Sequence, residues 1–401
     1  MSTHIIETRQ VPVKEAFDLI VAGGGVAGIA AGLAGARRGL KTMLVEKSPL
    51  LGGLATLGLI NWYEPLCDGT GRTMTTGIAE ELLKLSVAYG YGNLPEQWTR
   101  QGEPKPEPRK RYASRFNPSI FALALNELLV KNGVELRYDM IASWPVMEGC
   151  RCTGLITESA GGREYFPAKV IVDATGDADI MARAGVPCRN GVNYLTYTAH
   201  GCTTESIKKV QDSNDMVYLN DNRFWVGSDL NGRGHPEGLH FFWGIPNEER
   251  SEYIRMGQAL LLERIRDSRK DEMCPYALPG MAQLRKTRCI VGTETFIGED
   301  GQRRENSIGA AGDFRIPGKH YEIPLGVLFN GGFPNLLAAG RIVSADGDGW
   351  EITRVIPTAA LTGEAAGTAA SLMIGEGKQA GELNAQEIQR ALEKSGVKIH
   401  F

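Results

Sequence analysis

An uncharged apolar segment near the N-terminus gives the clearest structural signal in the chain. Residues 19–36 carry no charge and contain six glycines. A run of this length approaches that of a membrane span, but the glycines favour a buried strand, turn and helix of an α/β fold. The pattern predicts a strand over 18–22, a glycine turn, a helix over 26–38 and a second strand over 43–45.

Hydrophobic periodicity predicts further elements along the chain. Helices are expected at 78–89, 117–131, 252–269 and 357–374, and strands at 134–138, 141–147, 152–158, 164–168, 170–173 and 336–340. The short alternating segments within 141–168 are typical of an antiparallel meander. Residues 187–301 mix aromatic and polar segments and contain no second glycine fingerprint.

The glycine turn has the spacing of a dinucleotide-binding fingerprint. Gly23, Gly25 and Gly28 occupy the G-x-G-x-x-G positions. The first glycine permits the tight turn, the second lets a pyrophosphate approach the backbone, and the third lets the helix pack closely on the strand. The helix that follows offers N–H groups and a positive dipole end to phosphates. Glu46, at the end of the second strand, is placed to accept hydrogen bonds from ribose hydroxyls and disfavours a 2′-phosphate, which favours FAD or NAD over NADP.

Composition describes an ordinary globular protein. The chain has 401 residues, 42% of them hydrophobic and 23% charged, with a formal net charge of −3. Two domains are the natural expectation for this length, and the charge gives no bulk attraction to nucleic acid or to an anionic membrane. No secretory signal is visible, so a cytoplasmic location is expected. The seven cysteines are odd in number and form no metal-binding pattern, which predicts reduced thiols and no metal site.

Three separated motifs resemble those of the FAD-dependent oxidoreductase family, in the glutathione-reductase-like flavoprotein clan. The first is the 23–28 turn with Glu46 and the Gly52-Gly53 pair, the second is the Ala-Thr-Gly-Asp turn at 174–177, and the third runs from 335 to 367. In this clan FAD lies extended and is contacted by three distant parts of the chain, so the resemblance implies FAD rather than NAD. Residues 52–58 lack the histidine through which some relatives attach flavin covalently, so the FAD is expected to be non-covalent.

The resemblance implies specific cofactor contacts. They are Gly23, Gly25, Val26, Ala27, Gly28, Glu46, Lys47, Gly52, Gly53, Leu54, Ala174, Thr175, Gly176, Asp177, Gly340, Arg341, Pro357, Thr358 and Gly363. Pro357 fits the first turn of a helix, since it lacks an N–H and fixes φ. The dipole of that helix would stabilise negative charge on the flavin pyrimidine ring during reduction.

The expected fold is α/β, with two units. A Rossmann-like FAD-binding domain, made of a parallel sheet with a β-meander, accepts an inserted mixed α+β substrate domain. The FAD-binding domain is expected at 15–60, 115–186 and 302–376, the substrate domain at 187–301, a cap or lid at 61–114, and a C-terminal tail or helix at 377–401. The proline-rich charged run 102–111 is either a solvated surface loop or a lid over the active site.

Candidate catalytic residues come from the middle segment and its borders. Arg354 and Arg288 rank first, and His200 and His240 second. Further candidates are Tyr197, Arg285, His320 and Tyr321. Each has a structural alternative, because a buried histidine can serve packing alone and Arg288 can form a buried ion pair instead of binding a substrate carboxylate.

The leading hypothesis is a one-component FAD oxidoreductase that transfers hydride between flavin N5 and a small polar organic molecule. The alternatives are a tRNA-modifying or RNA-binding flavoprotein, against which the net charge of −3 argues, and a non-catalytic FAD-binding protein. Because no second nucleotide fingerprint is present, electrons are expected to come from the substrate or from a separate redox protein rather than from NADH or NADPH.

Overall fold

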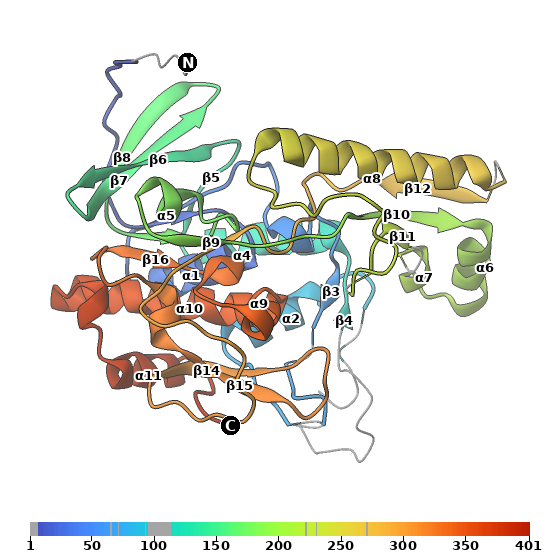
Figure 1. The fold of residues 1–401 in the computed structure, drawn as a ribbon. Helices are drawn as coiled ribbons and strands as arrows, with labels where there is room; N and C mark the ends of the chain where they lie inside the picture. The colour runs from blue at the N-terminus through green and yellow to red at the C-terminus, as the bar shows by residue number, and fades with distance from the viewer. Residues whose placement is uncertain are drawn as a thin grey trace.

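A large mixed sheet forms the centre of the protein. The computed structural model describes residues 7–64, 66–70, 72–92, 94, 114–220, 223–229, 231–269 and 272–401. Within these residues the sheet has seven strands in the order β5-β2-β1-β8-β7-β6, with β16 also paired to β8 (Figure 1). The strands are β1 (Phe17–Ala22), β2 (Thr42–Val45), β5 (Glu135–Arg137), β6 (Ile141–Glu148), β7 (Arg151–Ser159), β8 (Gly162–Asp173) and β16 (Leu336–Ala338). The α/β fold class is therefore confirmed.

Strand β8 belongs to both halves of this sheet. Its first half pairs antiparallel with β7, in register Arg163 with Glu158, and completes the meander. Its second half pairs parallel with β1 and β16, so that Asp173 lies opposite both Ala22 and Ala338. The expectation of two separate strands at 164–168 and 170–173 is wrong. The backbone stays extended because β8 pairs with β7 as far as Pro167, opposite Gly154, and with β1 from Ala168 onward, opposite Phe17.

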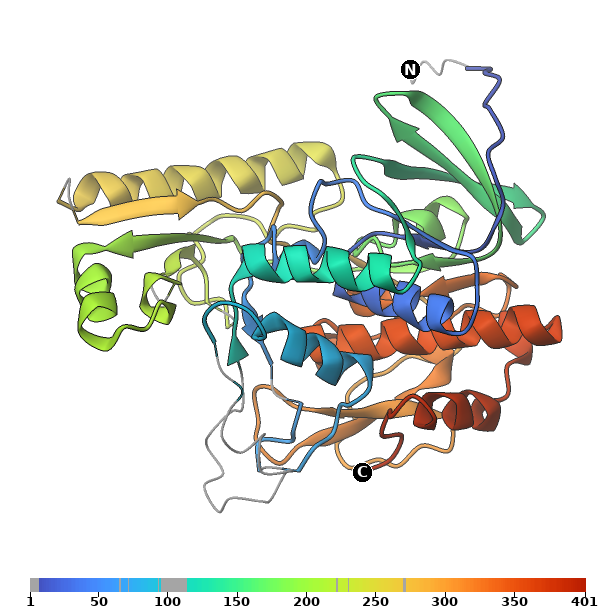
Figure 2. The ribbon, with the colours of Figure 1, turned by 180° about the vertical axis from the view of Figure 1, so that it is seen from behind.

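Helices α1 (Val26–Arg37) and α10 (Ile356–Glu376) lie side by side against the parallel strands (Figures 1 and 2). Two glycines of α10 allow this close approach. A Cβ at Gly363 would lie 2.1 Å from the carbonyl oxygen of Ala27, and one at Gly367 would lie 2.3 Å from that of Ala31. The first turn of α1 is thereby fixed against α10.

A second unit is built around α8 (Asn247–Asp267) and a three-stranded antiparallel sheet of β11 (Arg223–Gly227), β10 (Thr196–Thr203) and β12 (Met273–Ala277). It has small apolar cores of its own, separate from the main core. One contains Tyr197, Ala199, Phe224 and Leu261, and the other contains Leu195, Phe242, Tyr253 and Leu284. Helix α8 starts earlier than the expected residue 252 because polar residues after Pro246, with two glutamates, form its first turn.

The other elements complete the main core or connect the two units. They are β3 (Trp62–Tyr63), α2 (Ile78–Ser86), β4 (Ser114–Arg115), α4 (Pro118–Lys131), α5 (Asp179–Arg183), β9 (Cys188–Asn190), α6 (Thr204–Ser213), α7 (Val217–Asn220), β13 (Arg288–Ile290), β14 (Ser307–Gly312), β15 (His320–Pro324), η3 (Gly340–Ile342), α9 (Gly347–Thr353) and α11 (Ala385–Glu393). Helix α2 packs into the main core, and the assignment of residues 61–114 to a cap or lid stays a prediction. Val397 and Ile399 of the C-terminal segment are buried in the same core.

The structure does not describe the proline-rich charged run. Residues 102–111 lie outside the described residues, so the alternatives of surface loop and lid both stand. In the described part of the chain, no helix combines the length and apolar character needed to cross a membrane. All seven cysteines are free thiols.

Candidate functional site

A cavity of about 390 Å³ opens where the parallel strands β1, β2, β8 and β16 end. Its wall comes from the residues that follow each strand: Gly23 after β1, Glu46 after β2, Ala174 after β8 and Ala339 after β16. Ligands of open parallel sheets bind at this end of the strands. The sequence motifs, which are far apart along the chain, therefore meet in one cavity.

The three fingerprint glycines have different surroundings. Gly23 has φ +105°, and a Cβ there would lie 2.5 Å from the carbonyl oxygen of Ala174. A Cβ at Gly28 would lie 1.9 Å from the carbonyl oxygen of Gly23. Gly25 lines the cavity, and no atom lies within 4 Å of a Cβ built on it. Gly23 and Gly28 are required by protein packing, whereas Gly25 leaves space beside the cavity for a ligand to approach the backbone.

Two helix N-termini meet the cavity. Val26 and Ala27 at the start of α1 line it, as do Ile356 and Ala359 at the start of α10. Neither helix has a side-chain cap hydrogen bond at its N-terminus. Unpaired N–H groups and the positive ends of both dipoles therefore favour negative charge in this cavity.

Glu46 lies at the cavity with its carboxylate held in place. The N–H of Gly24 donates to Oε2 at 2.6 Å, and Ser48 donates to Oε1 from its N–H at 2.9 Å and from its hydroxyl at 2.7 Å. These contacts fix the orientation of the carboxylate, and the oxygens retain lone pairs for further donors.

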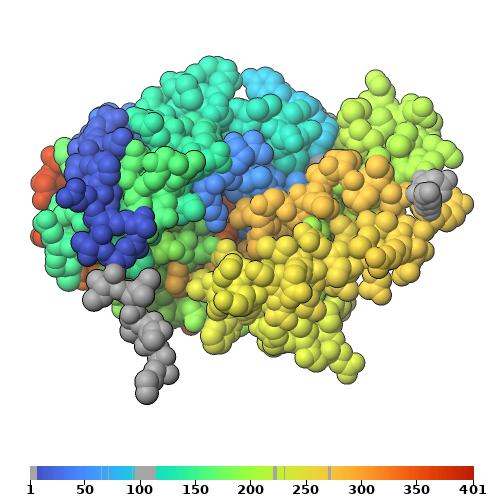
Figure 3. All heavy atoms as spheres, turned by 90° about the horizontal axis from the view of Figure 1, so that it is seen from above, coloured from blue at the N-terminus to red at the C-terminus, as the bar shows by residue number. Residues whose placement is uncertain are grey.

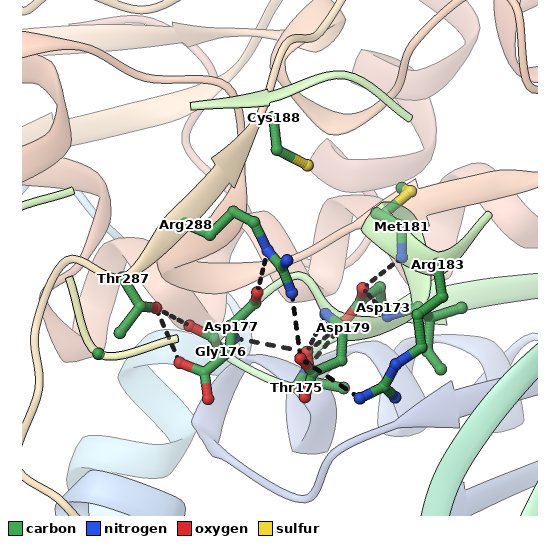
Figure 4. Close-up of polar contacts among 12 residues, drawn as sticks. Asp173, Thr175, Gly176, Asp177, Asp179, Met181, Arg183, Cys188, Thr287 and Arg288 are labelled. Atoms are coloured by element: carbon green, nitrogen blue, oxygen red, sulfur yellow. Dashed lines mark hydrogen bonds and ion pairs between the residues drawn. The ribbon is translucent and has the colours of Figure 1, made fainter. Parts of the chain in front are cut away.

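The turn after β8 is held by two buried aspartates (Figure 4). The carboxylate of Asp173 accepts hydrogen bonds from the N–H groups of Ile180 and Met181, each at 2.9 Å, which attaches α5 to the end of the strand. Asp177 accepts from Arg250 at 2.6 Å and from the hydroxyl of Thr287 at 2.7 Å.

The carboxylate of Asp177 is the shared acceptor of several buried donors. A third donor, Arg341, contributes a hydrogen bond of 3.1 Å to its carboxylate. Burial alone would raise the pKa of Asp177, but the guanidinium groups of Arg341 and Arg250 outweigh it and hold this pKa well below its usual range. Asp177 does not line the cavity, so its position offers no direct support for the predicted cofactor contact.

The four ranked catalytic candidates have very different surroundings. Arg354 lines the cavity and forms an ion pair with Glu351. Arg288 does not line it: its Nε donates to the backbone oxygen of Asp177 at 2.8 Å and its Nη2 to Asp179 at 3.1 Å (Figure 4). The structural alternative for Arg288, a partly buried ion pair, is the arrangement observed.

Neither histidine lines the cavity. His200 is buried on β10, with Nε2 at 3.0 Å from the backbone oxygen of Leu59. His240 has a side chain that is 53% exposed and lies 3.4 Å from Glu252. Arg354 is therefore the one of the four candidates that reaches this cavity.

Most predicted cofactor contacts line the cavity. They are Gly23, Gly25, Val26, Ala27, Glu46, Lys47, Gly52, Gly53, Leu54, Ala174, Thr175, Gly176, Gly340 and Arg341. Besides Gly28 and Asp177, the predicted residues Pro357, Thr358 and Gly363 are not in the lining. All three are buried in α10: Pro357 and Thr358 lie in its first turn, and Gly363, two turns along, makes the close contact with α1.

Sequence reasoning missed one wall of the cavity. Leu57, Gly280 and Met281 line it, and the N–H of Gly280 donates to the backbone oxygen of Leu57 at 2.9 Å. Seen from above, the blue atoms that follow β2 meet the gold atoms that follow β12 (Figure 3). This contact joins segments more than 200 residues apart and has no local signal in the sequence.

Comparison with known families decides the classification. The family model described as FAD dependent oxidoreductase matches residues 18–231 and 299–392, well over half of the chain. The chain belongs to the FAD dependent oxidoreductase family. It is accordingly an FAD-binding protein and an oxidoreductase, as the three sequence motifs predicted.

Several solved structures of low sequence identity are similar to this FAD dependent oxidoreductase. A geranylgeranyl bacteriochlorophyll reductase-like protein from Thermoplasma acidophilum aligns with 95% of this chain and 84% of its own, at 14% identity and a TM-score of 0.46. A myxobacterial chondrochloren halogenase aligns over 95% and 79%, at 17% identity and a TM-score of 0.45. L-proline dehydrogenase from P. horikoshii aligns over 97% and 100%, at 14% identity and a TM-score of 0.42.

Proposed function

We propose that this oxidoreductase holds FAD non-covalently in the cavity at the strand ends and transfers a hydride between flavin N5 and a small polar organic substrate. The observation that carries the proposal is the convergence of Gly25, Glu46 and the two uncapped helix N-termini on one cavity that Arg354 also lines. When bound, FAD supplies hydride chemistry at N5.

The residues present fit such a cofactor. The open space at Gly25 admits a pyrophosphate to the backbone, and the N-terminus of α1 stabilises its charge. Arg341 lines the cavity and its buried Nε has no hydrogen-bond partner among the described residues, so an anionic group would satisfy it. Glu46 is oriented to accept from ribose hydroxyls.

Other lining residues support the non-covalent and redox parts of the proposal. Among the described residues that line the cavity there is no Cys, His or Tyr, the side chains that would attach a flavin. The N-terminus of α10 at Ile356 and Ala359 favours negative charge on the ring system as it is reduced. Arg354 lines the same cavity and would contact the substrate or the cofactor there.

Two measurements test the proposal. The purified protein should be yellow and should release FAD into the supernatant when it is acid-precipitated. A colourless protein that cannot be reconstituted with FAD would refute the cofactor site, whereas flavin that precipitates with the protein would refute only non-covalent binding.

Anaerobic mixing with small polar metabolites should bleach the flavin for the correct substrate. NADH and NADPH should reduce it slowly and without saturation, because a dedicated nicotinamide domain is not expected. If no donor bleaches the flavin and no acceptor re-oxidises it, the protein is a non-catalytic FAD-binding protein. Flavin turnover that requires an RNA would favour the RNA-modifying alternative.

A further inference from the structure

A second, smaller pocket lies next to the cavity. It has a volume of about 70 Å³, and its lining includes Arg285, Lys286, Glu351 and Arg354. We call it the basic pocket. Because Arg354 lines both the cavity and the basic pocket, a molecule held in this pocket would lie beside the cavity in which FAD is proposed to bind.

The charges of the basic pocket are not balanced. Glu351 binds Lys286 at 2.6 Å through Oε1 and the Nε of Arg354 at 2.7 Å through Oε2. Burial raises the pKa of Glu351, but these two cations outweigh it and lower the pKa to about 2, so one negative charge serves two positive ones. Asp229 also lines the pocket but is paired with Arg233 at 2.8 Å.

Arg285 is the cation of the pocket that has no carboxylate in ion-pair contact, although Glu351 and Glu64 act on it from a greater distance. No carboxylate of the described residues lies within 4.0 Å of its guanidinium, which lies over the ring of Trp225 at 5.8 Å. Burial and then the positive charge of Arg354 lower the pKa of Arg285 to about 10, which leaves it protonated at neutral pH. A partly buried guanidinium with no anion in direct contact is unfavourable, and a carboxylate is the partner that matches its planar donors.

The backbone that carries this arginine is held rigidly. The side-chain oxygen of Asn193 accepts from the N–H of Arg285 at 2.7 Å and from that of Lys286 at 3.0 Å, and its amide donates to the backbone oxygen of Lys286 at 2.7 Å. Asn193 is itself buried. The backbone of the basic residues is therefore ordered before a ligand binds, which lowers the entropy cost of binding.

We infer that the substrate carries a carboxylate group, which binds in the basic pocket between Arg285 and Arg354. This inference rests on the proposed function and names the chemical class of its substrate. The carboxylate would anchor the molecule, and the remainder would extend past Arg354 into the cavity. Arg285 is thus a binding residue, whereas Arg288, three positions later in the same segment, is committed to Asp179.

The test compares acids with neutral molecules of the same shape. Acetate, succinate and benzoate, and the matching amides acetamide, succinamide and benzamide, are titrated into the FAD-loaded protein by calorimetry and by flavin difference absorbance. At least one acid should bind at least about tenfold more tightly than its amide and should perturb the flavin spectrum, since a charge-assisted contact is lost in the amide.

Variants assign the effect to the pocket. Arg285→Gln should weaken acid binding by about tenfold or more, and Arg285→Lys should retain part of it, while FAD content and thermal stability stay near those of the wild type. Arg255→Gln, at an exposed arginine of α8, is the matched control and should bind the acid normally.

The inference and the proposed function fail separately. Acids that bind no better than their amides, or an Arg285→Gln variant with unchanged acid affinity, would overturn the carboxylate site. The acid and amide comparison needs only the wild type, so a variant that does not fold leaves the test intact. Selective acid binding without flavin reduction by any compound would instead overturn hydride transfer and leave the site standing.

Discussion

Replacing Gly25 with alanine should separate cofactor binding from folding. Gly25 has φ −68° and ψ 173°, which alanine adopts without strain, and an added Cβ would meet no protein atom within 4 Å. The substitution restricts the unfolded chain, which stabilises the protein by about 0.4–1 kcal/mol, but alanine is a poorer N-cap than glycine by a similar amount. The unfolding free energy of the apoprotein should therefore change by less than about 1 kcal/mol.

The same methyl group should impair FAD binding. It would occupy the open space beside the first turn of α1, where the pyrophosphate is proposed to approach the backbone. Loss of one charge-assisted hydrogen bond costs about 1.5–3 kcal/mol, which corresponds to roughly 10-fold to 100-fold weaker binding. Quenching of flavin fluorescence on titration of the apoprotein measures this affinity, and chemical denaturation measures stability.

Gly28→Ala is the matched control for this experiment. Its Cβ would lie 1.9 Å from the carbonyl oxygen of Gly23, so the helix must move and the apoprotein should lose about 1–3 kcal/mol of stability. Wild-type FAD affinity in Gly25→Ala would refute the assignment of the pyrophosphate to this turn. Equal destabilisation by the two substitutions would show that the space at Gly25 is not open.

Three further substitutions address the cofactor contact of Glu46, the ion pair of Arg288 and the buried carboxyl group of Glu364. Glu46→Ala should weaken FAD binding by about 1–3 kcal/mol in the same titration, and unchanged affinity would mean that the ribose is held elsewhere. Arg288→Ala should lower the unfolding free energy by about 1–3 kcal/mol while the FAD affinity remains, and lost turnover at unchanged stability would instead make it catalytic. Burial raises the pKa of Glu364 to about 7, so between pH 4.5 and about 7 the folded state binds more protons than the unfolded state and stability falls as pH rises. Glu364→Gln should remove this dependence and gain up to about 3 kcal/mol relative to the wild type at pH 8, and parallel stability curves for the two proteins would contradict it.

The cofactor side of the site was accessible to sequence analysis because its signals are local. A glycine such as Gly23 is required by the backbone conformation at its own position, and Glu46 is the residue immediately after strand β2. The parallel register then brings the ends of neighbouring strands together without further information. The error in dividing β8 arose because one strand serves two pairing partners, and no residue marks the exchange.

The substrate side could not be predicted in the same way because long-range packing decides it. Arg285 and Arg288 lie in one short motif, yet Arg288 is on β13 and binds Asp179, whereas Arg285 precedes the strand and lines the basic pocket. Asn193, 92 positions away in the sequence, accepts a hydrogen bond from the N–H of Arg285 and so helps to hold that backbone in place. His200 resembled a catalytic base in the sequence, but the fold buries it against the backbone of Leu59.

The buried carboxylate of Asp177 links these two sides. It binds Arg341 from the wall of the cavity and Arg250 from α8 of the second unit, and both contacts are largely removed from water. Breaking a buried ion pair leaves an uncompensated charge and costs about 3–5 kcal/mol. A movement of α8 away from the cavity would have to break such a pair, so the two units should keep a fixed relation at this point. We therefore expect that the substrate enters the cavity without a movement of α8 that breaks the ion pair between Asp177 and Arg250.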